Sequence, residues 1–135
     1  MSASVIYTAP DGTENMDPDA EWLERLICHE DDSYWATGSG DAGLRFLVDD
    51  EKVAEMILVI RNSLGAMVHH LYSADGREYV MNEPALGTSE VTIRHGGNPW
   101  TLPRSFFIDR NAALVAVKRF LKDGKRVEGA EWAEY

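Results

Sequence analysis

Cysteine, long apolar runs and basic side chains are all scarce in this sequence. Cys28 is the single cysteine among 135 residues, so a disulfide within the chain is impossible and a structural zinc site built on two or more cysteines is excluded. The apolar runs Met56–Ile60 and Ala112–Val117 are far too short to span a membrane. The first residues have no basic segment and no long apolar stretch, so we expect no signal peptide and a cytoplasmic protein.

The motifs of several enzyme classes are also missing. The sequence has no Gly-x-Ser-x-Gly nucleophile elbow and no glycine-rich phosphate loop ending in Lys-Ser or Lys-Thr. A zinc deaminase needs His-x-Glu and Pro-Cys-x-x-Cys, which a chain with only Cys28 cannot supply. Gly38–Gly43 has Gly-x-Gly-x-x-Gly spacing, but a strand-like pattern follows it and Asp41 would repel a phosphate. We therefore predict no catalytic residue, no cofactor and no metal ion.

The histidines leave a small enzyme open as an alternative. His29 begins a stretch like a zinc-protease helix, but Ser33 stands where the second histidine is required. His69 and His70 lie on a predicted strand, so we expect their side chains on opposite faces, one packed in the sheet and one exposed. A hydrolase-like enzyme using scattered carboxylates with these histidines or His95 would need a pocket where titratable groups converge.

Turn signals and apolar periodicity predict two helices around a β-rich middle. Asp17-Pro18 is typical of a helix start, and an apolar stripe extends this helix to about Cys28. Asp109 is the predicted N-cap of a closing helix, Arg110–Lys122, with Gly124 just beyond its end. The predicted strands are Ser4–Ala9, Tyr34–Thr37, Leu44–Val48, Met56–Ile60, Leu64–Tyr72, Arg77–Met81 and Ser89–Arg94, and the predicted loops include Asp49–Lys52 and His95–Pro99.

These elements predict the fold class. Most of the strands follow one another through short turns, and Asp75-Gly76 is a strong two-residue hairpin signal, so the sheet should be antiparallel. Two amphipathic helices need an apolar face to cover. We expect a single α+β domain over residues 1–135: an antiparallel β-sheet of about five to six strands, with an N-terminal and a C-terminal helix packed on one face.

Negative charge is concentrated in the first part of the chain. The formal net charge is −10, and residues 1–55 hold 14 acids and 3 bases whereas residues 56–135 hold 9 acids and 10 bases. A concentrated negative field repels nucleic acid and anionic membranes, and it attracts a basic partner. The other interpretation is that the acids only keep the protein soluble.

The C-terminal third carries a family resemblance. Leu102–Asp109 leads into the closing helix, which ends Phe120-x-x-x-Gly124, and a short tail follows with Trp132 and the acid Glu134. This segment resembles the end of the first-numbered immunity-protein family of bacterial polymorphic toxin systems. The Asp75-Gly76 hairpin, followed by Tyr79, is similar as well. In the family the acid follows the tryptophan directly, whereas here it lies one residue further on.

The resemblance implies an α+β inhibitor without catalytic activity, and a partner from the deaminase class of toxins that is blocked by direct binding. The matching residues look structural and do not locate the binding surface. We expect the partner to be a basic toxin domain, with no direct contact to nucleic acid or membrane. An acidic regulatory or scaffold subunit without a toxin is the remaining alternative.

The predicted partner-binding residues come from the charge pattern. Acidic side chains can mimic phosphate in a basic groove and steer association, and aromatic side chains among charges are a common interface signature. Trp35 is compatible with either a core position or a partner surface. The predicted set is Asp31, Asp32, Asp41, Asp49, Asp50 and Glu51, with Tyr34 and Trp35 as aromatic anchors.

Overall fold

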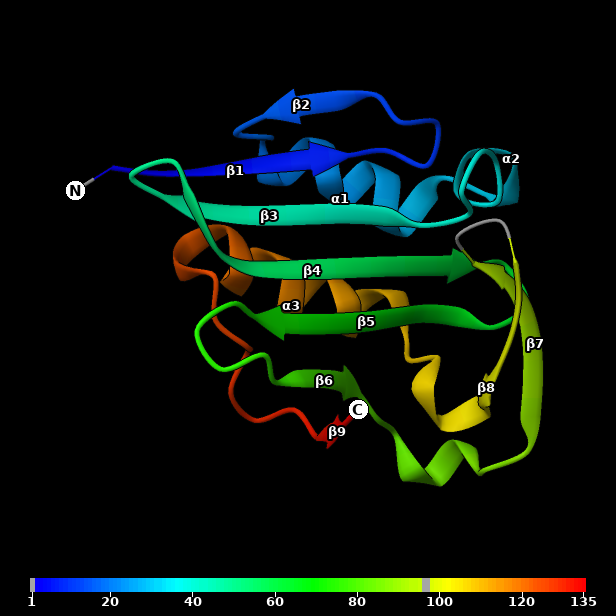
Figure 1. Cartoon of the computed structure of the whole chain (residues 1–135). Coiled ribbons are helices and arrows are strands. Elements are labelled where there is room, and N and C mark those ends of the chain that lie inside the picture. The colour runs from blue at the N-terminus through cyan, green and yellow to red at the C-terminus, as the bar shows by residue number, and fades with distance from the viewer. Residues whose placement is uncertain (1, 96–97) are drawn as a thin grey trace.

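A computed structural model describes residues 2–95 and 98–135 of the chain (Figure 1). The strands are β1 (Ala3–Thr8), β2 (Glu14–Met16), β3 (Ala42–Val48), β4 (Glu51–Arg61), β5 (Gly65–Tyr72), β6 (Glu78–Met81), β7 (Glu90–His95), β8 (Asn98–Pro103) and β9 (Trp132–Glu134). The helices are α1 (Ala20–His29), α2 (Asp32–Trp35) and α3 (Arg110–Asp123), and the 3-10 turns are η1 (Pro84–Leu86) and η2 (Arg104–Phe106).

The predicted α+β class is confirmed. Among the described residues, seven strands form one antiparallel sheet in the order β2-β1-β3-β4-β5-β6-β9, and β7 pairs with β8 in a separate hairpin. The sheet is therefore slightly larger than the five to six strands that the sequence predicts. The two additional strands, β2 and β9, have three residues each, which is too short to show an alternating pattern.

The first helix begins two residues later than predicted. Asp19 is its N-cap, and the Asp19 carboxylate accepts a hydrogen bond from the backbone N–H of Glu21 at 2.9 Å. Asp17 instead adopts a positive φ of 49°, and its carboxylate accepts from the backbone N–H of Val5 at 2.8 Å. Asp17 thus joins the segment before α1 to β1, and Asp19, two residues later, caps the helix.

The strand predicted over Tyr34–Thr37 is wrong. The segment is the short helix α2, and Asp31 caps it by accepting a hydrogen bond from the backbone N–H of Ser33 at 2.9 Å. Tyr34 and Trp35 favour strands intrinsically, but a side-chain cap and tertiary packing override so weak a preference.

The remaining middle strands are found where predicted, although β4 is longer than the predicted Met56–Ile60 and begins at Glu51, inside the predicted loop Asp49–Lys52. β4 and β5 pair over eight residues from Ala54 opposite Tyr72 to Arg61 opposite Gly65. β8 was missed because proline and glycine dominate the predicted loop His95–Pro99, of which residues 96 and 97 lie outside the described part of the chain. In the structure, β8 pairs with β7 from Asn98 to Pro103.

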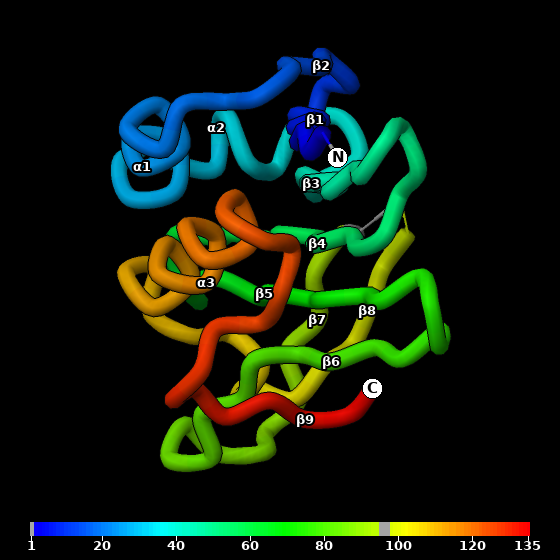
Figure 2. Tube along the Cα trace, turned by 90° about the vertical axis from the view of Figure 1, so that its left-hand side faces the viewer, coloured from blue at the N-terminus to red at the C-terminus, as the bar shows by residue number. Residues whose placement is uncertain are grey.

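The sheet has a core on each face. On one face, α1 and α3 cover a large cluster that includes Tyr7, Leu44, Leu58 and Phe120, and Figure 2 shows both helices together on that side. On the other face, a smaller cluster is formed by Val59, Met67, Val80, Ile93, Leu102 and Phe107, so the β7–β8 hairpin covers one end of β4, β5 and β6. The prediction that both helices lie on one face is confirmed.

The C-terminal end of α3 packs tightly against the sheet. Gly124 has a left-handed φ of 72°, and its backbone N–H donates to the carbonyl of Phe120 at 2.8 Å. A β-carbon placed on Gly124 would lie 2.8 Å from Cγ of Phe46. Glycine is therefore needed here both for the backbone conformation and for the close approach to β3.

We expect Gly124→Ala to lower the free energy of unfolding by on the order of 2–3 kcal/mol, because the left-handed backbone and the contact with Phe46 both oppose a methyl group. Gly76→Ala is the matched control. Gly76 has a φ of 69° but open space around the added carbon, so its substitution should cost about 1 kcal/mol. Urea denaturation measures both losses, and equal losses would show that the Phe46 contact contributes nothing.

Candidate partner-binding surface

Three of the predicted acids lie together at the end of the sheet beside α2. Asp31 caps α2, and the Asp32 carboxylate accepts from the backbone N–H of Asn62 at 2.8 Å. The Asp41 carboxylate accepts from the Ser39 hydroxyl at 2.5 Å. Each carboxylate is therefore fixed by a neighbouring backbone or hydroxyl group, and the positions of the three charges are set by the fold.

Two further acids join this end through a pair of tyrosines. Tyr7 and Tyr34 share a hydrogen bond of 2.7 Å between their hydroxyls. Burial raises the pKa of Tyr7 far above its usual value, with smaller contributions from Tyr34 and the charge of Asp11. Burial also raises the pKa of Tyr34, and the charges of Asp11 and Glu30 act in the same direction.

We call Asp11, Glu30, Asp31, Asp32 and Asp41 the α2-end acids. Sequence reasoning missed Asp11 and Glu30, because Asp11 belongs to a turn after β1 and Glu30 to a helix end, and nothing in their spacing connects them with Asp41. The turn signal at Pro10-Asp11-Gly12 identified a loop but not its neighbours.

Trp35 is not a partner-contacting anchor. Its side chain has no exposed surface, and its indole N–H donates to the carbonyl of Leu26 at 2.9 Å. Tyr34 packs edge-on against it with ring centroids 5.1 Å apart. The sequence left Trp35 open between core and surface, and the structure places it in the core because α2 turns the indole under α1. Tyr34 remains half-buried, with its hydroxyl at the acidic end.

The other three predicted acids form a separate group. Asp49, Asp50 and Glu51 are all exposed at the turn between β3 and β4, where Asp49 and Asp50 have positive φ values of 50° and 66°. The whole length of β3 separates Asp41 from Asp49, which at ~3.3 Å per residue is a distance of about 26 Å. We call Asp49, Asp50 and Glu51 the turn acids. The predicted surface is therefore two acidic groups at opposite ends of the same strand.

A buried arginine holds the α2 end together. The Arg61 side chain is 8% exposed, and its guanidinium donates to four backbone carbonyls: those of Trp35 at 3.3 Å, Gly40 at 3.0 Å, Ile60 at 2.8 Å and Arg94 at 2.7 Å. Burial lowers the pKa of Arg61, while the nearby charges of Asp32 and Asp41 oppose that change. One cation thus connects four segments: α2, strand β4, strand β7 and the loop that precedes β3. Nothing in the sequence pattern indicated this role for Arg61.

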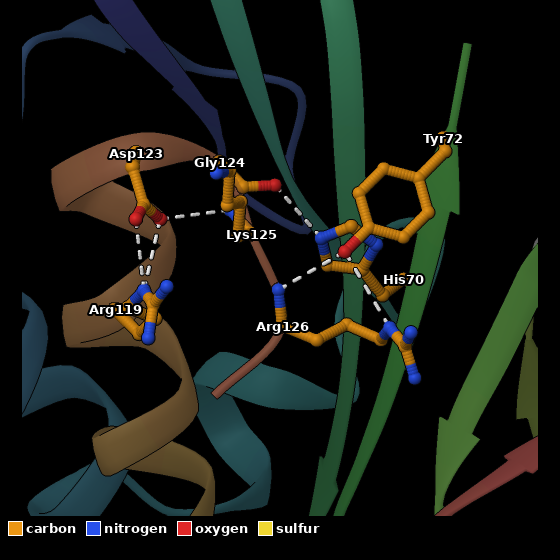
Figure 3. Close-up of polar contacts among 7 residues, drawn as sticks. All are labelled: His70, Tyr72, Arg119, Asp123, Gly124, Lys125 and Arg126. Atoms are coloured by element: carbon orange, nitrogen blue, oxygen red, sulfur yellow. Dashed lines mark hydrogen bonds and ion pairs between the residues drawn. The ribbon is translucent and has the colours of Figure 1, made fainter. Parts of the chain in front are cut away.

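The histidines serve the fold. His70 is fully buried on the helix-covered face, where its Nε2 lies 2.9 Å from the carbonyl oxygen of Gly124 and its ring lies 4.3 Å from that of Tyr72 (Figure 3). His69 points to the opposite face, as predicted, with Nε2 2.9 Å from Oε1 of Glu78. The expectation that one of the two is exposed is wrong, because Tyr135 lies 5.0 Å from the His69 ring and only 6% of His69 is exposed.

Metal-binding and nucleophilic groups are also accounted for in the described part of the chain. In residues 2–95 and 98–135, no three side chains of His, Cys, Asp or Glu are grouped so that they could hold a metal ion. Burial, followed by the charge of Glu24, raises the pKa of the Cys28 thiol, which keeps it in its weakly nucleophilic form. No helix in the same residues is long and apolar enough to cross a membrane.

Comparison with known proteins adds no assignment. No protein-family model matches the chain, and no curated protein is significantly similar to it.

Loss of the Tyr34 hydroxyl should be more damaging than loss of the Tyr7 hydroxyl. Tyr34→Phe leaves the fully buried Tyr7 hydroxyl without its partner, and we expect it to cost about 1–3 kcal/mol of unfolding free energy. Tyr7→Phe leaves a half-buried hydroxyl that water can reach, so its cost should be smaller, and the double variant should lose less than the sum. Chemical denaturation of the three variants checks this order, which an equal cost for both single variants would contradict.

The stability of the protein should fall below neutral pH through His70. Burial lowers the pKa of His70 to about 4, so its neutral form stabilises the fold fully above the unfolded value near 6.5 and this contribution is lost as the pH falls towards 4. The loss should reach roughly 3 kcal/mol at most.

His70→Gln removes the titration and should flatten the curve of unfolding free energy between pH 6.5 and 4. His29→Gln, at an exposed position, is the control and should leave the curve unchanged. Denaturation at a series of pH values provides the comparison, and parallel curves for the wild-type protein and His70→Gln would refute the assignment.

Proposed function

We propose that this protein is an immunity protein that binds a cognate nucleic-acid-targeting toxin, of the deaminase class, and neutralises it by occluding its active site or substrate groove. The residues behind the family resemblance are features of the fold. Phe120 is buried, Gly124 closes α3 against Phe46, and the Trp132 indole N–H donates to the carbonyl of Val127 at 3.2 Å. They build the closing helix and tail, and they do not by themselves locate the partner-binding surface.

The observation that carries the proposal is the placement of the acidic residues in two groups. The α2-end acids and the turn acids lie at the two ends of β3. Five of the thirteen Lys and Arg residues lie at the end of α3 and in the segment after it: Lys118, Arg119, Lys122, Lys125 and Arg126. An enzyme that acts on nucleic acid needs a basic groove for phosphates, and carboxylates at fixed spacings complement such a groove.

The rigidity of the acidic groups strengthens this argument. Asp31, Asp32 and Asp41 are each held by a hydrogen bond, and Arg61 fixes the segments that carry them. Fixed charges lose little side-chain entropy when a partner binds, so more of the electrostatic attraction contributes to affinity and to the association rate.

The primary experiment is rescue. Expression of the toxin domain encoded by the adjacent upstream gene should arrest cell growth, and co-expression of this protein should restore it. The two purified proteins should form a complex that suppresses nucleic-acid deamination in vitro. Normal toxin activity in the presence of excess protein would refute the proposal, and so would growth arrest that co-expression does not relieve.

The electrostatic part has its own test. Asn can replace Asp31 as a helix cap and can occupy the left-handed conformation of Asp49 and Asp50, so the quadruple change of Asp31, Asp41, Asp49 and Asp50 to Asn removes charge without rebuilding the backbone. At low salt we expect the association rate with the toxin domain to fall by on the order of 10- to 100-fold, and the difference to shrink as salt is added.

The matched control removes four exposed acids outside the two groups. Glu21, Glu83, Glu128 and Glu131, all changed to Gln, alter the net charge by the same amount. Stopped-flow measurement over a range of salt concentrations should show only a few-fold change for this control variant. Equal slowing of both variants would mean that net charge alone, and not its placement, drives association.

A further inference from the structure

We propose that the hollow between the end of α3 and the C-terminal tail binds a small organic phosphate monoester, with Arg126 and Lys125 holding its phosphate group. The organic part of the ligand packs on the apolar wall of the same hollow. This inference is independent of the proposed function, because it concerns the basic end of α3 and not the two acidic groups.

The charge of this region is opposite to that of the whole chain. Residues 110–126 hold six Lys and Arg residues and a single acid, Asp123, in a protein with a formal net charge of −10. Arg119 donates from Nε to both carboxylate oxygens of Asp123, at 3.0 and 2.9 Å, and the charge of Lys125 acts on Asp123 from further away. A local excess of cations attracts small anions even when the protein as a whole is acidic.

Aromatic rings hold the Arg126 side chain in place. Its Cζ lies 3.7 Å from the centroid of the Tyr79 ring, and 5.8 and 5.9 Å from the centroids of Tyr72 and Trp132. The backbone N–H and Nε of Arg126 both donate to the Tyr72 hydroxyl, at 3.2 and 3.4 Å (Figure 3). Stacking of this kind fixes the plane of a guanidinium group without using its terminal N–H groups.

The terminal nitrogens of Arg126 are free to bind a ligand. Within residues 2–95 and 98–135 they have no hydrogen bond or ion pair, and they are not buried. Two parallel N–H donors of a guanidinium group match two oxygens of a phosphate. Since the rings and the Tyr72 hydroxyl already order the side chain, binding costs little further side-chain entropy.

The hollow has room for more than a phosphate group. Its volume is about 400 Å³, and Arg119, Lys125 and Arg126 are its cationic lining residues. Its apolar wall consists of half-buried residues of the tail: Val127, Ala130 and Trp132. Binding sites for small molecules commonly combine such an apolar wall with a few charged groups that orient the ligand. An organic group attached to the phosphate would cover this wall.

The two cations favour a phosphate over a carboxylate. A carboxylate can occupy the fork of Arg126, but a phosphate monoester has a third oxygen for Lys125 and carries a charge of about −1.5 to −2 at neutral pH. Glu128 is the carboxylate in the lining, and it is exposed without an ion pair in the described part of the chain. Its charge opposes an anion, so Glu128 and Lys125 should affect binding in opposite directions.

The test uses AMP as a phosphate monoester, with adenosine and inorganic phosphate as the two comparison ligands. The indole N–H of Trp132 lines the hollow, and its NMR signal should report binding to the ¹⁵N-labelled protein at low ionic strength. We expect the Kd for AMP to be at least about 10-fold lower than the Kd for adenosine, because hydrogen bonds between charged groups are the strong ones. Inorganic phosphate should shift the signal too, with a higher Kd than AMP, because it leaves the apolar wall uncovered.

Three results with the wild-type protein would overturn the inference. A Trp132 signal that stays unchanged up to about 10 mM AMP would mean that the hollow binds no phosphate. Equal affinity for AMP and adenosine would mean that the cations do not contribute. Equal affinity for AMP and inorganic phosphate would mean that the ligand is free phosphate and not a monoester.

Substitutions of exposed side chains locate the phosphate group without disturbing the fold. Lys125→Gln should raise the Kd for AMP about two- to fivefold, and Glu128→Gln should lower it about twofold, because each removes one charge beside the phosphate. Lys52→Gln is the matched control, since it removes an exposed cation on β4 and should leave the Kd unchanged. A change at Lys52 equal to that at Lys125, or shifts of the same sign at Lys125 and Glu128, would contradict the site.

Arg126→Lys tests the guanidinium fork itself. The variant keeps the positive charge but loses the paired donors, so we expect the Kd for AMP to rise about 10-fold. Circular dichroism melts check that this variant folds, because Arg126 also contacts Tyr72. Unchanged affinity in a folded Arg126→Lys variant would show that the fork does not hold the phosphate.

Discussion

The Arg61 guanidinium, buried among four backbone carbonyls, is the interaction on which the acidic end of the molecule depends. A buried charge is tolerated only where its hydrogen-bond donors have acceptors. Here the acceptors come from α2, strand β4, strand β7 and the loop that precedes β3. Asp32 and Asp41 lie close enough to oppose the effect of burial on its pKa. The same cation thus joins four segments and partly balances the carboxylates around it, so the acidic surface is a property of the fold and not of mobile side chains.

The layers of the fold give the molecule two different sides. The helices close one face of the sheet with a large apolar core, and the basic end of α3 lies on that side. The β7–β8 hairpin closes only part of the other face, which leaves half-buried apolar residues between two acidic groups.

Much of the fold could be predicted because the decisive signals are local. Asp109 and Gly124 mark the ends of α3, and Asp75-Gly76 marks a hairpin, through backbone preferences that neighbouring residues determine. The candidate site was harder to predict than the fold, because it depends on contacts between segments that are distant in the sequence. The sequence identified Asp31 and Asp41 but could not show that Asp11 joins them, that β3 separates them from Asp49, or that Trp35 is enclosed beneath α1. Composition indicates how much charge there is, whereas topology decides where it lies.

The turn between β3 and β4 has an evolutionary consequence. Asp49 and Asp50 both adopt left-handed backbone conformations, which Asp, Asn and Gly tolerate far better than other residues. Substitution at these positions is therefore confined to a small set whose members differ mainly in charge. The codons for Asp and Asn differ by one base, so a lineage can add or remove a negative charge at the tip of this hairpin while its shape persists. The charge that this turn presents to a partner can therefore change in single steps.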